Sequence, residues 1–390
     1  MIYADYNGSA PLCREVIDYL KDRLENGPYS NPNAIHQLGQ KTKLAMENAR
    51  SVCAKTLGAK PKQIIFNSGS TEGISHVFFS LLHGKLKEEN SGDKKDVIII
   101  SGIEHSAVIN NANFYKEDQG YKVEVIPTDC NGQVNVNALE SILKENKNKV
   151  ALVAVMAANN ETGVIQPYSE IGKLCVEHKT FFVCDTTQYL GKTPFHFGES
   201  DIDFAFLSGH KVGAMTGAGF ILAKDPALLR AHVIGGGQEK NLRGGTQNYI
   251  GFETIAVAMD TFEKKREKVA ELAQKRATFE KKIKEKYPVV IMGEDAPRLG
   301  GTTFISLPGV HGQAVQIELE TQNIFVTTSS ACSDNEPTTS KVLKSMGVTD
   351  DVGRGAVRIS VGPCSPEDSY DKIFIALDKA YEKLSKIKSY

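Results

Sequence analysis

The sequence lacks several features that mark specialised classes of protein. Its seven cysteines are scattered, odd in number and never form a C-x-x-C pair, which argues against a disulfide framework and against a metal site. No apolar run approaches the roughly 20 residues that a membrane-spanning helix needs. The N-terminal MIYADYNGSAP has no charged region followed by an apolar one, so no secretory signal is expected. These absences predict a reduced, cytoplasmic protein with no membrane contact.

The sequence also has no excess of either charge. Lys and Arg number 46 against 47 Asp and Glu, giving a formal charge of -1, so direct binding of nucleic acid is not expected. The length of 390 residues exceeds what a single hydrophobic core usually serves. Two domains are therefore expected.

Short apolar runs alternate with helix-like stretches in the first part of the chain. The runs lie at 63–66, 97–100, 151–155, 181–184, 204–207 and 219–223. Runs without polar alternation are typical of strands buried on both faces of a mostly parallel sheet. The stretches between them are long enough to be crossover helices. This part of the chain is predicted to be an α/β domain.

The pattern changes after Gly251. Residues 252–286 are charged and contain no Gly or Pro, which predicts one or two helices. Strand-like segments follow around 302–307, 324–326 and 356–361, and a closing amphipathic helix places Ile373 and Leu377 on one face. We therefore expect a large α/β domain at 15–258, and a smaller α+β domain formed by 1–14 and 259–390.

Polar residues follow several of the apolar runs, where ligands bind in open α/β sheets. Residues 67–73, N-S-G-S-T-E-G, open a helix and suit a phosphate, although an ordinary helix N-cap explains them equally well. His105 follows the second run, where a structural histidine is the more common case. Asn160 lies in a polar loop after 151–155, which a plain Asn/Gly turn also explains.

Two charged residues follow later runs. Asp185 comes after 181–184, where a carboxylate is costly unless it pairs with a cation such as a protonated pyridine nitrogen; a buried helix cap is the alternative. Lys211, in S-G-H-K, is followed by glycines and suits a desolvated amine that forms a Schiff base, although most lysines are simply solvated. Together these residues supply the parts of a pyridoxal-phosphate site.

An ordered set of motifs resembles the class V aminotransferases, and more narrowly the cysteine desulfurases that feed iron–sulfur cluster assembly and thiolation. The motifs are S-G-S-T-E (68–72), E-H (104–105), N-N-E-T-G-V (159–164), C-D-T-T-Q (184–188), S-G-H-K (208–211), G-G-G-Q-E-x-x-L-R-G-G-T (235–246), S-S-A-C (329–332) and V-R-I-S-V-G (357–362). The resemblance implies a homodimeric, fold-type I pyridoxal-phosphate transferase with a mostly parallel sheet of the seven-stranded type.

The resemblance also implies a role for each matched residue. Lys211 would bind the cofactor covalently, and Cys332 would take sulfur from L-cysteine as a persulfide. The other contacts would be His105 stacked on the ring and moving protons, Asp185 at the pyridine nitrogen, Gln188 at the ring hydroxyl, Ser70, Thr71, Ser208 and His210 at the phosphate, Thr246 at the phosphate of the other subunit's cofactor, and Asn160 and Arg358 at the substrate carboxylate.

Cys332 stands out without the resemblance as well. It lies in a stretch of small polar residues, 327–337, that is typical of an exposed loop, whereas free cysteines are usually buried. The sequence departs from the family at 5–11, D-Y-N-G-S-A-P, and in a slightly short spacing between Cys332 and Glu336. Both departures concern the substrate side. A sulfur-acceptor protein, either a cluster scaffold or a thiolation enzyme, would be the partner.

Three alternatives remain at this point. A selenocysteine lyase, or another class V lyase or aminotransferase, would use the same ring contacts. A scaffold or regulatory protein would keep the fold without turnover. A dinucleotide-binding protein would need a strand–G-x-G-x-x-G–helix unit, which the sequence lacks.

Overall fold

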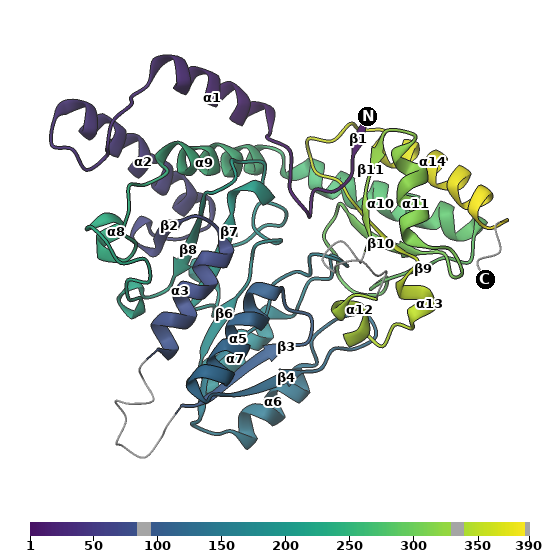
Figure 1. Ribbon diagram of the computed structural model, residues 1–390, viewed down its shortest axis with the longest axis horizontal. Helices are drawn as coiled ribbons and strands as arrows, with labels where there is room; N and C mark the ends of the chain where they lie inside the picture. Colours follow the sequence, from purple (N-terminus) through teal and green to yellow (C-terminus); the bar gives the residue numbers. More distant parts are fainter. Residues whose placement is uncertain (84–94, 329–338, 387–390) are drawn as a thin grey trace.

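The computed structural model describes residues 1–83, 95–328 and 339–386 (Figure 1). Over these ranges the chain forms a large unit around a seven-stranded sheet and a smaller unit around a four-stranded sheet. No helix in the described ranges is long and apolar enough to cross a membrane.

The large sheet has the strand order β2-β8-β7-β6-β5-β3-β4. Neighbours from β7 to β4 in this order pair in parallel, whereas β8 is antiparallel to both β7 and β2. Every residue of β3, β5, β7 and β8 is buried, so the predicted strands with two buried faces are confirmed. The bounds are β2 (Ile64–Asn67), β3 (Val97–Ser101), β4 (Lys122–Ile126), β5 (Val150–Ala154), β6 (Phe181–Cys184), β7 (Phe204–Ser208) and β8 (Gly219–Ala223).

Helices cover both faces of this sheet (Figure 1). One face packs against a cluster that includes Phe66 and Leu207 together with residues of α2, α7 and α9. The other face packs Phe206 and Ile98 against α3 and α5. The helices of this unit are α1 (Arg14–Asn26), α2 (Gln37–Thr56), α3 (Ser70–Leu82), α5 (Ser106–Gln119), α6 (Val136–Glu145), α7 (Tyr168–Glu177), α8 (Gln238–Asn241) and α9 (Tyr249–Lys264).

The smaller unit contains the later strands. Its sheet has the order β12-β13-β10-β9, and β1 pairs in parallel with β11. The strands are β1 (Ile2–Tyr3), β9 (Val290–Ile291), β10 (Thr302–Ser306), β11 (Ile324–Phe325), β12 (Thr327–Thr328) and β13 (Ala356–Ser360), and the helices are α10 (Arg266–Lys286), α11 (Gly312–Glu320), α12 (Lys341–Ser345), α13 (Asp350–Gly353) and α14 (Ser369–Leu384).

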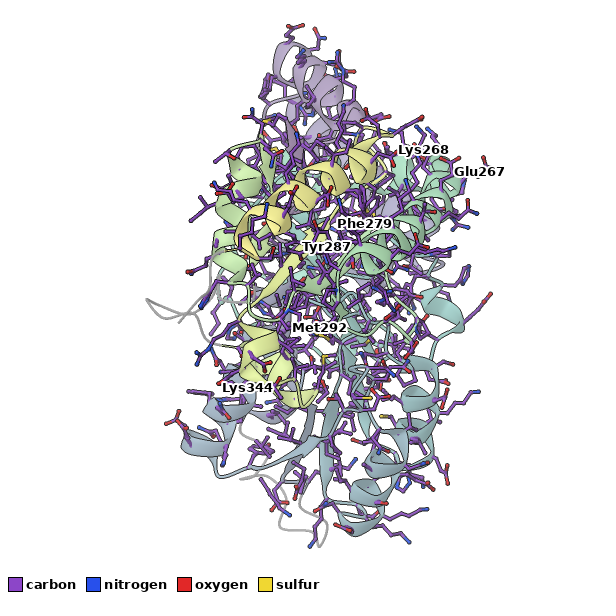
Figure 2. The ribbon with its side chains drawn as sticks, turned by 90° about the vertical axis from the view of Figure 1, so that its right-hand side faces the viewer. Glu267, Lys268, Phe279, Tyr287, Met292 and Lys344 are labelled. Carbon is purple, nitrogen blue, oxygen red and sulfur yellow. The ribbon has the colours of Figure 1, made fainter. Side chains whose placement is uncertain are left out.

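Aromatic contacts hold α10 against α14. Phe279 and Tyr287, both labelled in Figure 2, contact Tyr370 and Tyr381 of α14 with ring centroids 5.4 and 5.3 Å apart. The charged segment 252–286 contains most of α9 and all of α10, with Lys265 between them, so the prediction of one or two helices is confirmed. The predicted domain boundary between 258 and 259 falls inside α9 and stays a prediction.

Candidate active site

A pocket of about 430 Å³ lies beyond the carboxyl ends of the parallel strands, where the N-terminal segment crosses them. Ten of the predicted site residues line it: Ser70, Thr71, His105, Asn160, Asp185, Gln188, Ser208, His210, Lys211 and Arg358. Thr246 does not line this pocket, and Cys332 lies outside the described residues. The strand-end residues therefore converge, although they come from widely separated parts of the chain.

The N-terminus of α3 forms one end of the pocket. Gly69 precedes the helix with a φ of 149°, and a Cβ atom there would lie 3.1 Å from Ser208 Oγ, so only glycine fits easily. The Ser70 N–H donates to Ser208 Oγ at 2.8 Å, and the hydroxyls of Ser70 and Thr187 lie 2.6 Å apart. Hydroxyls at the positive end of a helix dipole suit a phosphate.

Asp185 is buried directly after β6. Its Oδ1 accepts a hydrogen bond from the Thr187 N–H at 3.0 Å and another from the Thr187 hydroxyl. The carboxylate is therefore held by its own turn, and Thr187 links it to Ser70 at the helix end. A carboxylate held in this way is ready to pair with a cation inside the pocket.

His105 caps α5. Its Nδ1 accepts a hydrogen bond from the Ala107 N–H at 3.1 Å, which fixes the orientation of the ring. Because Nδ1 is the acceptor, the proton of the neutral ring lies on Nε2. The imidazole is thus a donor toward whatever enters the pocket.

Lys211 ends a 3₁₀ turn after β7, and the N-terminal segment contacts it. Its Nζ donates to the backbone carbonyls of Asn7 at 2.8 Å and Gly8 at 2.7 Å. The neighbouring His210 lies 3.1 Å from Ser9 Oγ through Nδ1. Burial, with Lys211 and Lys192 nearby, lowers the pKa of His210 to about 4, so this ring is neutral near pH 7.

Arg358 of β13 also lines the pocket. Its Nη2 pairs with Asp5 Oδ1 at 2.6 Å, and its Nη1 donates to the Asn160 carbonyl at 2.9 Å. Its Nε is buried and has no hydrogen-bond partner within the described part of the chain. A guanidinium whose two terminal nitrogens are held by the protein, and whose Nε–H has no partner among the described residues, suits a carboxylate ligand.

Thr246 lies in the glycine-rich segment 235–246, away from the pocket, and is exposed. This segment is anchored by Glu239, which is buried and pairs with Arg50 at 2.7 Å. The site of one chain therefore does not include Thr246. A role for this residue requires a second subunit and stays a prediction.

Comparison with known proteins identifies the family. The family model for Aminotransferase class-V matches residues 2–372. Cysteine desulfurase IscS of Dictyoglomus turgidum is 30% identical, covering 100% of this chain and 96% of that protein. Cysteine desulfurase IscS of Rickettsia typhi is 32% identical, with coverages of 99% and 92%. The chain belongs to the class V aminotransferase family.

Solved structures agree with this assignment. A NifS-like protein superposes with a TM-score of 0.88 at 30% identity, covering 99% of this chain and 100% of that one. The structure of SspA in complex with cysteine superposes with a TM-score of 0.80 at 28% identity, with coverages of 93% and 99%. The predicted family and the predicted fold type I are therefore confirmed for this class V aminotransferase.

The sequence did not indicate Thr187 and Asn7, which line the pocket, or the buried Glu104 next to His105. Thr187 belongs to the C-D-T-T-Q motif, which implies no role for it, and Asn7 lies in the segment 5–11, where the sequence departs from the family. Glu104, next to His105, is buried; its Oε1 accepts from the Met156 N–H at 2.9 Å and from the Ser101 hydroxyl. Burial raises the pKa of Glu104 to about 8, so the carboxyl is largely protonated at pH 7.

Proposed function

We propose that this chain is a pyridoxal-phosphate-dependent cysteine desulfurase that transfers the sulfur of L-cysteine to Cys332 and releases L-alanine. One observation carries the proposal: ten residues expected of such an enzyme line a single pocket. They do so in a chain that is similar over nearly its full length to proteins named cysteine desulfurase. The product sulfur would serve iron–sulfur cluster assembly or thiolation.

The pocket residues suit both the phosphate group and the pyridine ring of pyridoxal phosphate. Ser70, Ser208 and His210 would bind the phosphate, because the two hydroxyls lie at the start of α3 and the neutral His210 imidazole lines the same pocket. Asp185 would face the ring nitrogen and Gln188 the ring hydroxyl. When bound, the cofactor supplies an electron sink that stabilises negative charge at the substrate Cα.

The remaining pocket residues would act on the substrate. Lys211 would hold the cofactor covalently, and its amine is already positioned by the Asn7 and Gly8 carbonyls. Arg358 would bind the substrate carboxylate, together with the Asn160 side chain. His105 would lie over the ring and pass protons through Nε2, the nitrogen that its helix-capping bond leaves protonated.

Sulfur transfer needs a nucleophile besides the lysine. The Cys332 thiolate would attack the substrate sulfur, so that an S–S bond forms while the C–S bond breaks and its electron pair stays on carbon. Protonation of that carbon then gives alanine. A thiolate suits this step because it is nucleophilic near neutral pH, unlike a serine hydroxyl.

We also propose that the active unit is a homodimer. Several large apolar side chains are exposed on α1, on α2 and just before α2 and the glycine-rich segment: Leu24, Leu38, Leu44, Ile35 and Ile234, the last two 95% and 86% exposed. Asn33 donates to Gln247 Oε1 at 3.2 Å, which places the segment that precedes α2 beside Gln247, the neighbour of Thr246. A second copy that covers this surface would bring Thr246 toward a neighbouring site.

The sulfur acceptor would be a cluster scaffold or a thiolation enzyme, and the compartment would be the cytoplasm. The cysteines in the described ranges, Cys13, Cys53, Cys130, Cys175, Cys184 and Cys364, are all free thiols, which suits a reducing compartment.

A substrate comparison tests the proposal. The purified holoenzyme would be given L-cysteine, selenocysteine or cysteine sulfinate, with alanine measured by chromatography and persulfide by mass spectrometry of the Cys332 peptide. Borohydride reduction followed by peptide mapping would locate the cofactor. We expect alanine and a Cys332 persulfide from L-cysteine, and the reduced adduct on Lys211. Turnover of selenocysteine alone would favour a lyase, and no turnover of any substrate would favour a scaffold.

A further inference from the structure

Lys192 lies beside the active site but does not line its pocket. It is four residues after Gln188 on consecutive turns that follow β6, and it lines a neighbouring cavity together with Lys211 and Asn7. Its Nζ donates to Gln188 Oε1 and, at 2.9 Å, to Asn7 Oδ1. No role for this lysine followed from the motifs.

The hydrogen bonds around Lys192 determine how both amides are oriented. Gln188 Nε2 donates to the Asn7 backbone carbonyl at 2.8 Å, so Oε1 faces Lys192. Asn7 Nδ2 donates to Thr302 Oγ1 at 3.0 Å and to the Asn160 carbonyl at 3.2 Å, so Oδ1 faces Lys192 too. The two amide oxygens therefore accept hydrogen bonds from the same amine. Lysine can donate to both whether its amine is charged or neutral, because either form has at least two N–H groups.

Lys192 thus prevents the Gln188 amide from flipping. A flip would turn the NH₂ group toward the amine and would point Oε1 at the Asn7 carbonyl, so that both contacts become unfavourable. One N–H of Gln188 is used by Asn7, and the other is left for the pocket that Gln188 lines. A donor at this position suits an anionic or hydroxyl oxygen, whereas an amide carbonyl would repel an anionic one.

We propose that Lys192 is a positioning residue, which holds Gln188 with its amide N–H toward the ring hydroxyl oxygen of the cofactor. The proposal rests on the proposed function, because it presumes pyridoxal phosphate in the pocket. Lys192 does not line the pocket, so it would act on the cofactor through Gln188. Its bond to the amide oxygen also polarises the amide, which makes the N–H a stronger donor.

A cofactor analogue isolates this effect from general structural damage. Apoenzyme would be titrated with pyridoxal phosphate and with 3-deoxypyridoxal phosphate, which lacks the ring hydroxyl, and the two Kd values compared. Lys192→Met should weaken binding of pyridoxal phosphate about five- to tenfold, the worth of one hydrogen bond, and change binding of the analogue less than about twofold. Gln188→Leu should give the same pattern, and the double variant should be no worse than either single one.

The outcomes separate the two proposals. Equal losses for both ligands in Lys192→Met would show a merely structural role and would overturn this inference. Failure of the wild-type protein to bind pyridoxal phosphate would instead overturn the proposed function. Should Lys192→Met not fold, as judged by the Tm of the apoprotein, Lys192→Leu is measured in the same way and against the same criterion. The loss for each ligand is the variant's Kd divided by the wild-type Kd for that ligand, so intrinsic differences in affinity between the two ligands cancel.

Discussion

Arg358 Nη2 and Asp5 Oδ1 lie 2.6 Å apart, and this ion pair joins β13 to the N-terminal segment at the edge of the pocket. The Asn160 carbonyl holds the other end of the guanidinium at 2.9 Å, while the buried Nε has no partner among the described residues. The guanidinium is therefore held in place by the protein itself before any substrate binds.

Arg358→Lys should weaken substrate binding and leave cofactor binding intact. A lysine offers no planar fork for a carboxylate, so the KM for L-cysteine should rise about tenfold or more, while the Kd for pyridoxal phosphate changes less than about twofold. Steady-state kinetics and cofactor titration check this. Arg354→Lys, at the end of α13 with a half-exposed side chain, is the matched control and should leave KM unchanged. An equal effect of both substitutions would contradict the role.

Cys332→Ser should separate cofactor chemistry from sulfur transfer. The variant should bind the cofactor and show spectral changes with L-cysteine, but it should release essentially no alanine and form no persulfide. Cys364→Ser, which changes an exposed cysteine outside the pocket lining, should retain activity. Near-normal sulfide release from Cys332→Ser under reducing conditions would instead indicate a lyase that uses no enzyme persulfide.

Mixing two inactive variants should restore activity if the sites are shared between subunits. A heterodimer of Lys211→Ala and Thr246→Ala would contain one site with both lesions and one intact site. Random exchange at equal amounts should recover about one quarter of wild-type activity, since half of the dimers are mixed and each has one working site. Native mass spectrometry would confirm exchange. Full exchange without recovery would argue for independent sites.

Glu104→Gln should make stability less dependent on pH. Burial raises the pKa of Glu104 from 4.5 to about 8, so between these values the folded protein holds a proton that the unfolded chain has released. Stability contributed by this proton is therefore lost as pH rises through that window. The glutamine variant has no such proton, so relative to wild type it should gain on the order of 3–4 kcal/mol of stability between pH 5 and pH 8, with little difference at pH 5. Urea unfolding at both pH values checks this; parallel pH profiles would refute it.

Glu239→Ala should destabilise the protein strongly. The Glu239 carboxylate pairs with both terminal nitrogens of Arg50 at 2.7 and 2.8 Å and accepts the Phe66 N–H at 2.9 Å. Removing it leaves the buried Arg50 guanidinium with only the half-exposed Glu47 as an acidic partner, and it takes the acceptor from the Phe66 N–H, at a cost of about 3–5 kcal/mol. Glu47→Ala is the matched control, because Glu47 also contacts Arg50 but is half-exposed, and it should cost less than about 1 kcal/mol. Similar losses in thermal unfolding would contradict this ranking.

Most of the large sheet could be predicted because its strands are buried on both faces. The run 204–207 contains no polar residue, and every residue of β7 is buried. β4 could not be predicted in this way, because most of its residues are not buried. It lies at the sheet edge with the sequence K-V-E-V-I, and only Ile126 is fully buried, so it shows no uninterrupted apolar run.

The pocket could be predicted only where a residue follows a strand or belongs to a motif. Asp185 and Lys211 met both conditions. Asn7 met neither, because its importance comes from contacts with Lys211 and Gln188, which lie 204 and 181 residues away in sequence. Lys192 looks like any surface lysine until the fold places two amide oxygens beside it.

The contact between the N-terminal segment and β13 also has a consequence for biosynthesis. Asp5 and Arg358 are separated by 353 residues, as are Asn7 and Ser360, whose backbone N–H and hydroxyl lie 3.0 Å apart. A ribosome releases the first member of each pair long before the second. The large sheet has all its strands available once β8 emerges, whereas the wall that carries Asn7 must wait for β13. The pocket therefore cannot be completed before β13 has been made, because Arg358, which lines it, is among the last residues of the lining to leave the ribosome.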